Sequence, residues 1–216
     1  MKKVRLFFCV VVMTGIMISS CGKGASIEVS IGKQVWMSEN LNVDKFRNGD
    51  PIPEAKTDEE WQKAGKNGEP AWCYYNNNPD NGDRCGKLYN WFAVNDPRGL
   101  APNGWKIPSE EDWNRLIDFL GGYSVARMKM KSTEFWADND GESGNGTNES
   151  DFSGLPGGLR YYDGTFSSIG DGGYWWTSSE FVTGYAWHLP LYYDNHAVYR
   201  YDGRKGGGLS VRCLRD

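Results

Sequence analysis

The chain has 216 residues, 39% of them hydrophobic and 24% charged, and a formal net charge of −4. This length suits one domain with a full hydrophobic core, and the acidic balance argues against binding nucleic acid or anionic membranes through bulk charge. No stretch after the first twenty residues is apolar enough to predict a membrane span.

Residues 1–20 are predicted to be an export signal. Lys2, Lys3 and Arg5 form a basic start, and the run Leu6–Ile18 is almost wholly apolar. Ile18-Ser-Ser-Cys21 then resembles the bacterial lipobox, in which the cysteine is acylated with chains such as palmitate and becomes the first residue. The alternatives are an ordinary secretory signal or a single membrane anchor, but the apolar run is short for a span.

Cleavage before Cys21 would leave 196 residues. It removes three of the 24 basic residues and none of the 28 acidic ones, so the mature net charge becomes −7. Residues 21–26 are then expected to be a short tether and residues 27–216 a single globular domain. Several acyl chains on Cys21 would anchor the protein stably. Because Gly22 follows Cys21, without the familiar Asp retention signal, the outer membrane is the expected location. Its inner or outer face stays open.

The first elements are short. Residues 27–42 alternate apolar and polar side chains around Gly32-Lys33, which predicts a hairpin. Thr57 and Glu60 have capping-box spacing and predict a helix of one or two turns, broken within Gly65–Pro70. Residues 71–94 surround a turn-rich Asn/Asp/Gly/Pro centre.

Cys73 and Cys85 flank that turn-rich centre. In an oxidising compartment a disulfide between them is expected, and the alternative is two reduced thiols. The following run Leu88–Val94 is compatible with either a short helix or a buried strand, because its periodicity does not decide between them.

The segment Gly104–Gly122 predicts the central helix. Ser109 and Asp112 have capping-box spacing after Pro108, and Gly121-Gly122 can end the helix in left-handed conformations. Because so short a helix is unstable alone, its apolar stripe must pack on the rest of the domain. The stripe has the spacing i, i+3, i+4, i+7 and consists of Trp113, Leu116, Ile117 and Leu120.

Arg127–Lys131 alternates and predicts a strand. The long polar segment 138–158 follows, and Asp138, Asp140 and Glu142 supply oxygens of the kind that calcium prefers. The glycine at 141 does not match the position required in an EF-hand loop, so a solvated loop is the competing interpretation.

The last third of the chain predicts an antiparallel sheet of short strands. The expected strands are Tyr174–Thr177, Tyr185–Tyr193 with Pro190 at an edge or bulge, Ala197–Tyr201 and Leu209–Leu214. Because helices come mainly before these strands, the expected class is α+β, with short helices packed on an antiparallel sheet.

Six motifs in order resemble the Fibrobacter succinogenes major paralogous domain, a family common in lipoproteins of Bacteroidetes. They are Gln34–Leu41, Gly86–Trp91, Gly104–Ser109 with Trp113, Gly146–Ser150 with Phe152 and Leu155–Gly158, Tyr174–Ser179, and Leu209–Cys213. The family carries no established activity. Its pattern is similar to C-type-lectin-like and formylglycine-generating-enzyme folds, which bears on fold and not on function.

The residues favour no enzyme class. His188 and His196 are the two histidines, too few for a zinc site. Ser178 or Ser179 with His188 could contribute to a triad, but no nucleophile elbow is present. The formylglycine-generating reaction would need copper on paired reactive cysteines, whereas Cys213 is expected in the core. The carboxylate pairs Glu59-Glu60 and Glu110-Glu111 suit first turns of helices, where they favour the helix dipole.

Binding is the favoured function, with a glycan or a surface protein as ligand. The chain has ten tryptophans and twelve tyrosines, and aromatic faces stack on sugars and peptides. Most of the tryptophans are expected in the core, in particular Trp36, Trp91, Trp105, Trp113 and Trp175. The expected surface-binding residues are Tyr161, Tyr162, Tyr192, Tyr193 and His196. The alternatives are a structural role in a surface assembly and, less favoured, an enzyme.

Overall fold

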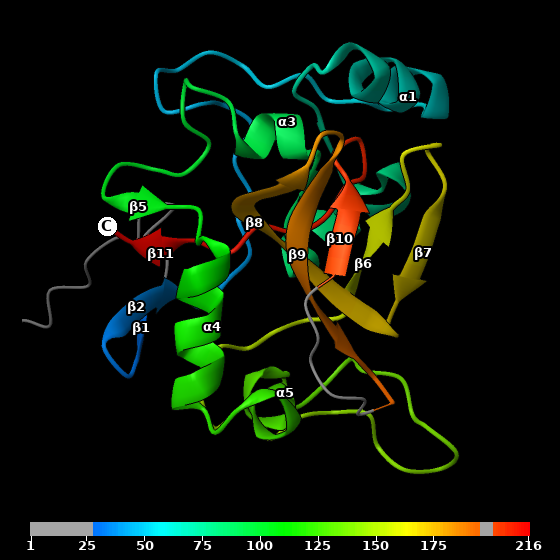
Figure 1. Cartoon of the computed structure of the whole chain (residues 1–216). Coiled ribbons are helices and arrows are strands. Elements are labelled where there is room, and N and C mark those ends of the chain that lie inside the picture. The colour runs from blue at the N-terminus through cyan, green and yellow to red at the C-terminus, as the bar shows by residue number, and fades with distance from the viewer. Residues whose placement is uncertain (1–27, 195–200) are drawn as a thin grey trace, which may run out of the picture.

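The computed structural model describes residues 28–194 and 201–216, and these form a mixed α+β fold (Figure 1). The predicted signal, Cys21 and the tether lie outside the described residues. Within the described ranges, no helix is both long and apolar enough to cross a bilayer. The fold has a four-stranded sheet, a five-stranded sheet and a short two-stranded pair, with helix α4 beside the two larger sheets.

The four-stranded sheet begins with the predicted hairpin. Strands β1 (Glu28–Ile31) and β2 (Gln34–Met37) pair antiparallel around a turn in which Gly32 takes a φ of 62°. The C-terminal strand β11 (Leu214–Arg215) lies between β2 and β5 (Trp105–Lys106), so the order is β1-β2-β11-β5. The first and last described segments therefore close one sheet.

The five-stranded sheet has the order β10-β9-β8-β6-β7. It is antiparallel except for the contact of β6 with β8, where Gly158 pairs with Gly173 in parallel register. The longest pairing joins β8 and β9, with irregular register after Trp176. The strands are β6 (Gly157–Arg160), β7 (Phe166–Ile169), β8 (Gly172–Val182), β9 (Tyr185–Tyr192) and β10 (Tyr201–Arg204).

Of the predicted late strands, one lies mostly outside the described residues and one differs from the structure. Residues 195–200 lie outside the described residues, so of the predicted strand Ala197–Tyr201 only Tyr201 is described, as the start of β10. Leu209–Leu214 is no continuous strand. Its residues bridge different partners in turn, Leu209 with Tyr89 and Ser210 with Trp175, before β11 begins at Leu214.

Helix α4 (Glu110–Phe119) confirms the central prediction. Ser109 and Asp112 form the capping box, and all four residues of the predicted stripe are buried. The next helix corrects the sequence analysis, because Arg127–Lys131 was expected as a strand. Residues Tyr123–Met130 form α5 instead, in which Ala126 and Met130 are buried at i, i+4 spacing.

The region around residues 57–94 is more helical than expected. Helix α1 (Asp58–Asn67) has the predicted capping box but runs past Gly65 and ends at the left-handed Gly68, with a φ of 70°. The turn-rich centre contains the 3-10 helix Tyr75–Asn77 and helix α2 (Pro79–Cys85). Leu88–Val94 divides into strand β4 (Leu88–Tyr89), which pairs with β3 (Trp72–Cys73), and helix α3 (Trp91–Val94).

The expected Cys73–Cys85 disulfide is not formed. Both residues are buried free thiols. The Cys73 side chain lies in the cluster beneath α1, where burial raises its pKa to about 12 against the opposing effect of the Arg160 cation. Cys85 ends α2 and packs close to Gly157. The two side chains thus pack in different surroundings, although short sequence separation had suggested a pair.

The core consists of three groups of buried side chains. The five tryptophans expected in the core are all buried. The group beneath α4 contains Trp36, Trp113 and Trp175 packed around Phe152, with ring centroids of Trp36 and Trp113 4.6 Å apart. Because these aromatic side chains come from β2, α4, β8 and a loop, this core joins both larger sheets to the helix.

Candidate functional site

Two adjoining hollows lie where the five-stranded sheet meets α1 and α3. The first has a volume of about 310 Å³ and the second about 440 Å³, and they share Tyr162, Tyr185 and Arg204. We call their union the aromatic cleft. Its characteristic lining side chains are Tyr161, Tyr162, Trp176, Tyr185, His188 and Arg204, with Gln62 and Lys66 of α1 on the second hollow.

The floor of the aromatic cleft is built by strand pairing. Trp176 of β8 is fully buried and lies opposite His188 of β9, with ring centroids 5.9 Å apart. The Trp176 Nε1 donates to the Tyr89 carbonyl oxygen at 2.8 Å, which fixes the indole. A Cβ atom on Gly203 of β10 would lie 3.2 Å from Trp176 and 3.3 Å from His188. Because residue 203 is glycine, no side chain from this position covers the Trp176 and His188 rings.

The wall of the cleft is a turn that carries Tyr161 and Tyr162. The turn is closed by the Tyr161 amide, which donates to the Thr165 carbonyl oxygen at 2.7 Å. Gly164 has a φ of 94°, and a Cβ atom there would come within 2.6 Å of Asp58. Tyr161 and Tyr162 remain 47% and 48% exposed, so both expected binding residues present their rings at the surface of a fixed turn.

Arg160 fixes this turn to helix α1. Its side chain is fully buried, and its guanidinium donates to the Gly164 and Ala55 carbonyl oxygens at 2.9 and 3.0 Å and to an Asp58 carboxylate oxygen at 2.9 Å. Gln62 adds a bond from its side-chain amide to the Asp163 carbonyl oxygen at 2.7 Å. Because these bonds hold the turn against α1 through protein groups alone, the wall is preorganised, which lowers the entropic cost of binding.

His188 is neutral at physiological pH. Burial lowers its pKa to about 4, and its Nδ1 is buried without a hydrogen-bond partner among the described residues. The Ser179 hydroxyl, expected as one possible triad member, accepts instead from the Glu110 amide at 3.0 Å. His188 thus contributes an uncharged ring to the cleft floor.

The other expected binding residues lie elsewhere. Tyr192 is half-buried and packs edge-on against Tyr174, with centroids 5.8 Å apart. Tyr193 packs against the core group beneath α4. His196 lies outside the described residues. Among the five expected binding residues, Tyr161 and Tyr162 are the two that the structure brings together at the cleft.

The expected calcium ligands do not converge. Asn139 and Glu142 exchange backbone hydrogen bonds of 2.8 and 2.9 Å around Asp140-Gly141, which have φ angles of 49° and 88°. This is a tight hairpin turn, and Asp138, Asp140 and Glu142 are exposed on it. In residues 28–194 and 201–216, no three His, Cys, Asp or Glu side chains are grouped to hold a metal ion.

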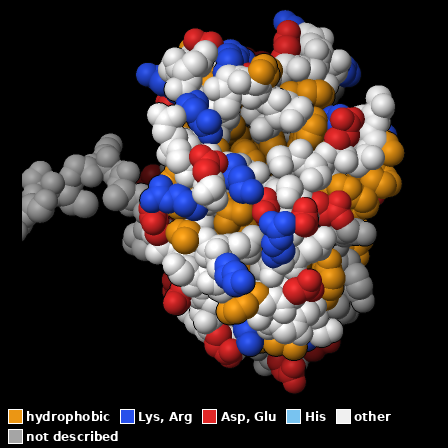
Figure 2. All heavy atoms as spheres, turned by 60° about the vertical axis from the view of Figure 1, so that its left-hand side comes forward, with side chains coloured by type: hydrophobic (Ala, Val, Ile, Leu, Met, Phe, Trp, Pro, Cys, Tyr) orange, Lys and Arg blue, Asp and Glu red, His pale blue; other side chains and the backbone are white. Residues whose placement is uncertain are grey.

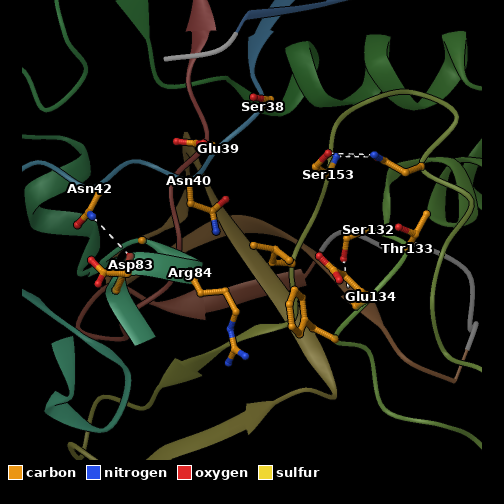
Figure 3. A pocket seen from close by; sticks show the side chains of 15 residues that line it. Ser38, Glu39, Asn40, Asn42, Asp83, Arg84, Ser132, Thr133, Glu134 and Ser153 are labelled. Atoms are coloured by element: carbon orange, nitrogen blue, oxygen red, sulfur yellow. Dashed lines mark hydrogen bonds between the residues drawn. The ribbon is translucent and has the colours of Figure 1, made fainter. Parts of the chain in front are cut away.

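A separate polar groove of about 370 Å³ lies between α2 and the loops after β2 and α5 (Figure 3). Its lining includes Ser38, Glu39, Asn40, Asn42, Asp83, Arg84, Ser132, Thr133, Glu134, Phe135, Asn148, Ser153 and Leu155.

Most amides of the polar groove already have protein partners. The Asn40 side-chain oxygen Oδ1 accepts from Trp175 Nε1 at 2.8 Å and from the buried Arg212 at 2.8 Å. The Asn148 side chain bonds both the amide and the hydroxyl of Ser153. Because these groups tie loops to the core, the groove wall is mainly structural, and the aromatic cleft is the better ligand site.

Sequence reasoning missed Trp176, Tyr185 and Arg204 as cleft residues. Trp176 belongs to an apolar strand that is indistinguishable from core in the sequence, and Tyr185 and Arg204 come together only through the β9–β10 register.

One face of the molecule carries charges of both signs. Figure 2 shows acidic and basic side chains interspersed over the face that includes the left side of Figure 1, with apolar side chains in small groups. No single-sign patch dominates this face, which agrees with the mixed composition of the sequence.

The comparisons with known proteins give one match. A family model described as the Fibrobacter succinogenes major domain matches residues 29–215. No curated protein and no solved structure matches the chain. The family match covers both sheets, α4 and the aromatic cleft. The chain therefore belongs to the Fibrobacter succinogenes major domain family.

Proposed function

We propose that this protein is a cell-envelope lipoprotein whose domain binds a glycan, without catalysis, in the aromatic cleft. The observation that carries the proposal is the pair of half-exposed rings, Tyr161 and Tyr162, on a fixed turn beside a hollow of about 310 Å³. Sugar rings stack their apolar faces on aromatic side chains, and concave sites with a few polar groups suit small ligands.

The polar groups of the cleft support recognition of hydroxylated ligands. Arg204, Lys66 and Gln62 lie around the aromatic surface and supply hydrogen-bond donors. The neutral, half-buried His188 and the free-thiol cysteines, which burial keeps protonated, support a non-catalytic role. The proposal also takes the fold to be C-type-lectin-like, supported by short helices that precede an antiparallel sheet containing Trp175-Trp176.

The proposed location is the outer membrane, through acylation of Cys21. The support is sequence-based: a basic start, an apolar run and a lipobox-like end. Two acyl signals on one residue are enough for stable anchoring. The ligand would then be a glycan, or a surface protein carrying one, that reaches the envelope from outside or from the periplasm.

Calorimetry of the full chain in mild detergent against plant and host polysaccharide fragments tests the function. We expect saturable binding that Tyr162→Ala abolishes. Phe135→Ala is the matched control, because Phe135 is 47% exposed but lies in the polar groove. Equal loss in both variants, or no binding of any glycan, would contradict the proposal. Co-purification of a stable protein partner without glycan binding would favour the structural role in a surface assembly.

A further inference from the structure

Two cations at the aromatic cleft lack acidic partners within the described part of the chain. Arg204 and Lys66 are exposed and line the second hollow, and neither forms an ion pair with any described residue. Lys205, next in the chain, is paired with Glu180 at 2.5 Å. In a chain of net charge −4, cations left without acids at a concave site can serve a ligand.

The Arg204 guanidinium is oriented by aromatic rings. Its Cζ lies 4.1 Å from the centroid of the Tyr162 ring and 5.9 Å from that of Tyr185. A guanidinium that stacks on an aromatic ring uses its flat face for the contact, and its N–H groups point outward in the guanidinium plane. No described residue accepts from these N–H groups, so their fork is available for a planar anion.

The acidic groups of the cleft are poorly placed to satisfy Arg204. The Asp163 carboxylate accepts from the Thr165 amide at 3.0 Å and from its hydroxyl at 2.7 Å, which closes its own turn. Asp202 lines the first hollow and forms no ion pair with a described residue. It lies two residues before Arg204 on β10, where it would repel an anionic ligand without neutralising Arg204.

We propose that the aromatic cleft selects carboxylate-bearing glycans, in which a uronic acid ring stacks on Tyr161 or Tyr162 and its carboxylate binds Arg204. The planar carboxylate matches the guanidinium fork and accepts two parallel hydrogen bonds. Lys66 adds a second positive charge at the rim. This inference rests on the proposed function, because it names the ligand class of the same cleft.

Titration of the full chain in mild detergent with three probes tests the selectivity. The probes are oligogalacturonate, its methyl ester and a sulfated neutral oligosaccharide. We expect oligogalacturonate to bind at least about tenfold more tightly than the ester, because charge-assisted hydrogen bonds are the strong ones. The advantage should shrink as salt rises, because screening weakens the attraction. If the sulfated sugar matches oligogalacturonate, the assignment to carboxylates is overturned.

Variants locate the selectivity. Arg204→Gln should abolish the difference between acid and ester, and Arg204→Lys should restore only part of it because the fork is lost. Asp202→Asn should strengthen binding of the acid. Arg84→Gln is the matched control, since Arg84 also stacks on an aromatic ring, 4.9 Å from the centroid of Phe135, but in the polar groove. Unchanged melting of Arg204→Gln confirms that it is folded.

The outcomes separate this inference from the proposed function. If the ester and the acid bind equally and Tyr162→Ala abolishes both, the glycan function stands and the carboxylate selectivity is wrong. If no probe binds but a plant or host polysaccharide fragment does, the carboxylate selectivity is wrong and the glycan function stands; if none of these ligands binds, both are wrong. A preference for the acid that Arg204→Gln leaves intact would also overturn the assignment to Arg204.

Discussion

Replacing Leu116 with alanine tests how α4 holds the two larger sheets together. Leu116 has no exposed surface and belongs to the core group beneath α4, with Trp36 from β2 and Trp175 from β8. The substitution removes three carbon groups, worth about 0.8 kcal/mol each in transfer free energy. A residual cavity of about 50 Å³ would add about 1.2 kcal/mol. We therefore expect the free energy of unfolding to fall by about 3.5 kcal/mol.

Urea unfolding followed by tryptophan fluorescence measures this loss. The buried tryptophans around Leu116 report directly on the packing of α4. Phe119→Ala is the control on the same helix, because Phe119 is 63% exposed. The control should lose less than about 1 kcal/mol, as most surface substitutions do. A loss below about 0.5 kcal/mol for Leu116→Ala would refute the packing of this stripe against the sheets.

Three further results are expected. Cys21→Ser should release the protein from the membrane fraction and remove the acyl mass; a variant that stays membrane-bound would disprove the anchor. Cys73 and Cys213 should resist alkylation at pH 8 until urea unfolds the chain, and burial raises the pKa of each to about 12. Because the unfolded thiols ionise near pH 9 and the buried ones near pH 12, the stability that these two buried thiols contribute is complete below pH 9 and is lost as pH rises toward 12. A disulfide found by intact mass would contradict this. Burial alone would raise the pKa of Asp112, but hydrogen bonds from neighbouring basic and hydroxyl side chains lower it below 3.8. Asp112→Asn should therefore destabilise the protein at pH 7, with urea midpoints that converge with wild type as pH falls below 3.8.

Local signals predicted local structure well. The capping boxes at Thr57 and Ser109 and the turn at Gly32 are each formed as expected, because the groups involved lie within a few residues of one another. The buried stripe of α4 followed from helical spacing alone. The exposure of Tyr161 and Tyr162 was predicted from their lack of an apolar pattern.

Misleading alternation explains the error at α5. Met128 and Met130 alternate with charged residues, which is typical of a strand, but the buried residues are Ala126 and Met130. Gly122, with a φ of 86°, begins a new helix directly after α4, and the i, i+4 pair then packs inward. Tertiary packing thus selected one of two periods that the sequence allows.

The cleft could not be predicted because its parts meet through strand register. Arg204 reaches Tyr162 across the sheet edge, and the pairing of Arg204 with Tyr185 depends on how β9 and β10 align. The disulfide was predicted wrongly because the directions of the two side chains depend on the fold. Nearness of Cys73 and Cys85 in the sequence does not determine which way each side chain faces.

The segment Leu209–Leu214 has a consequence for biosynthesis. Leu209 exchanges backbone hydrogen bonds with Tyr89. The Val211 carbonyl oxygen accepts from the Leu41 amide in the loop after β2, and the Cys213 carbonyl oxygen accepts from the amide of Met37, the last residue of β2. Leu214 then completes the four-stranded sheet. A nascent chain that has not yet released this segment from the ribosome lacks the connection between its earliest and middle parts. Such a chain also lacks Leu214, which pairs with both β2 and β5 and belongs to the core group beneath α4, so this sheet and this core are completed last.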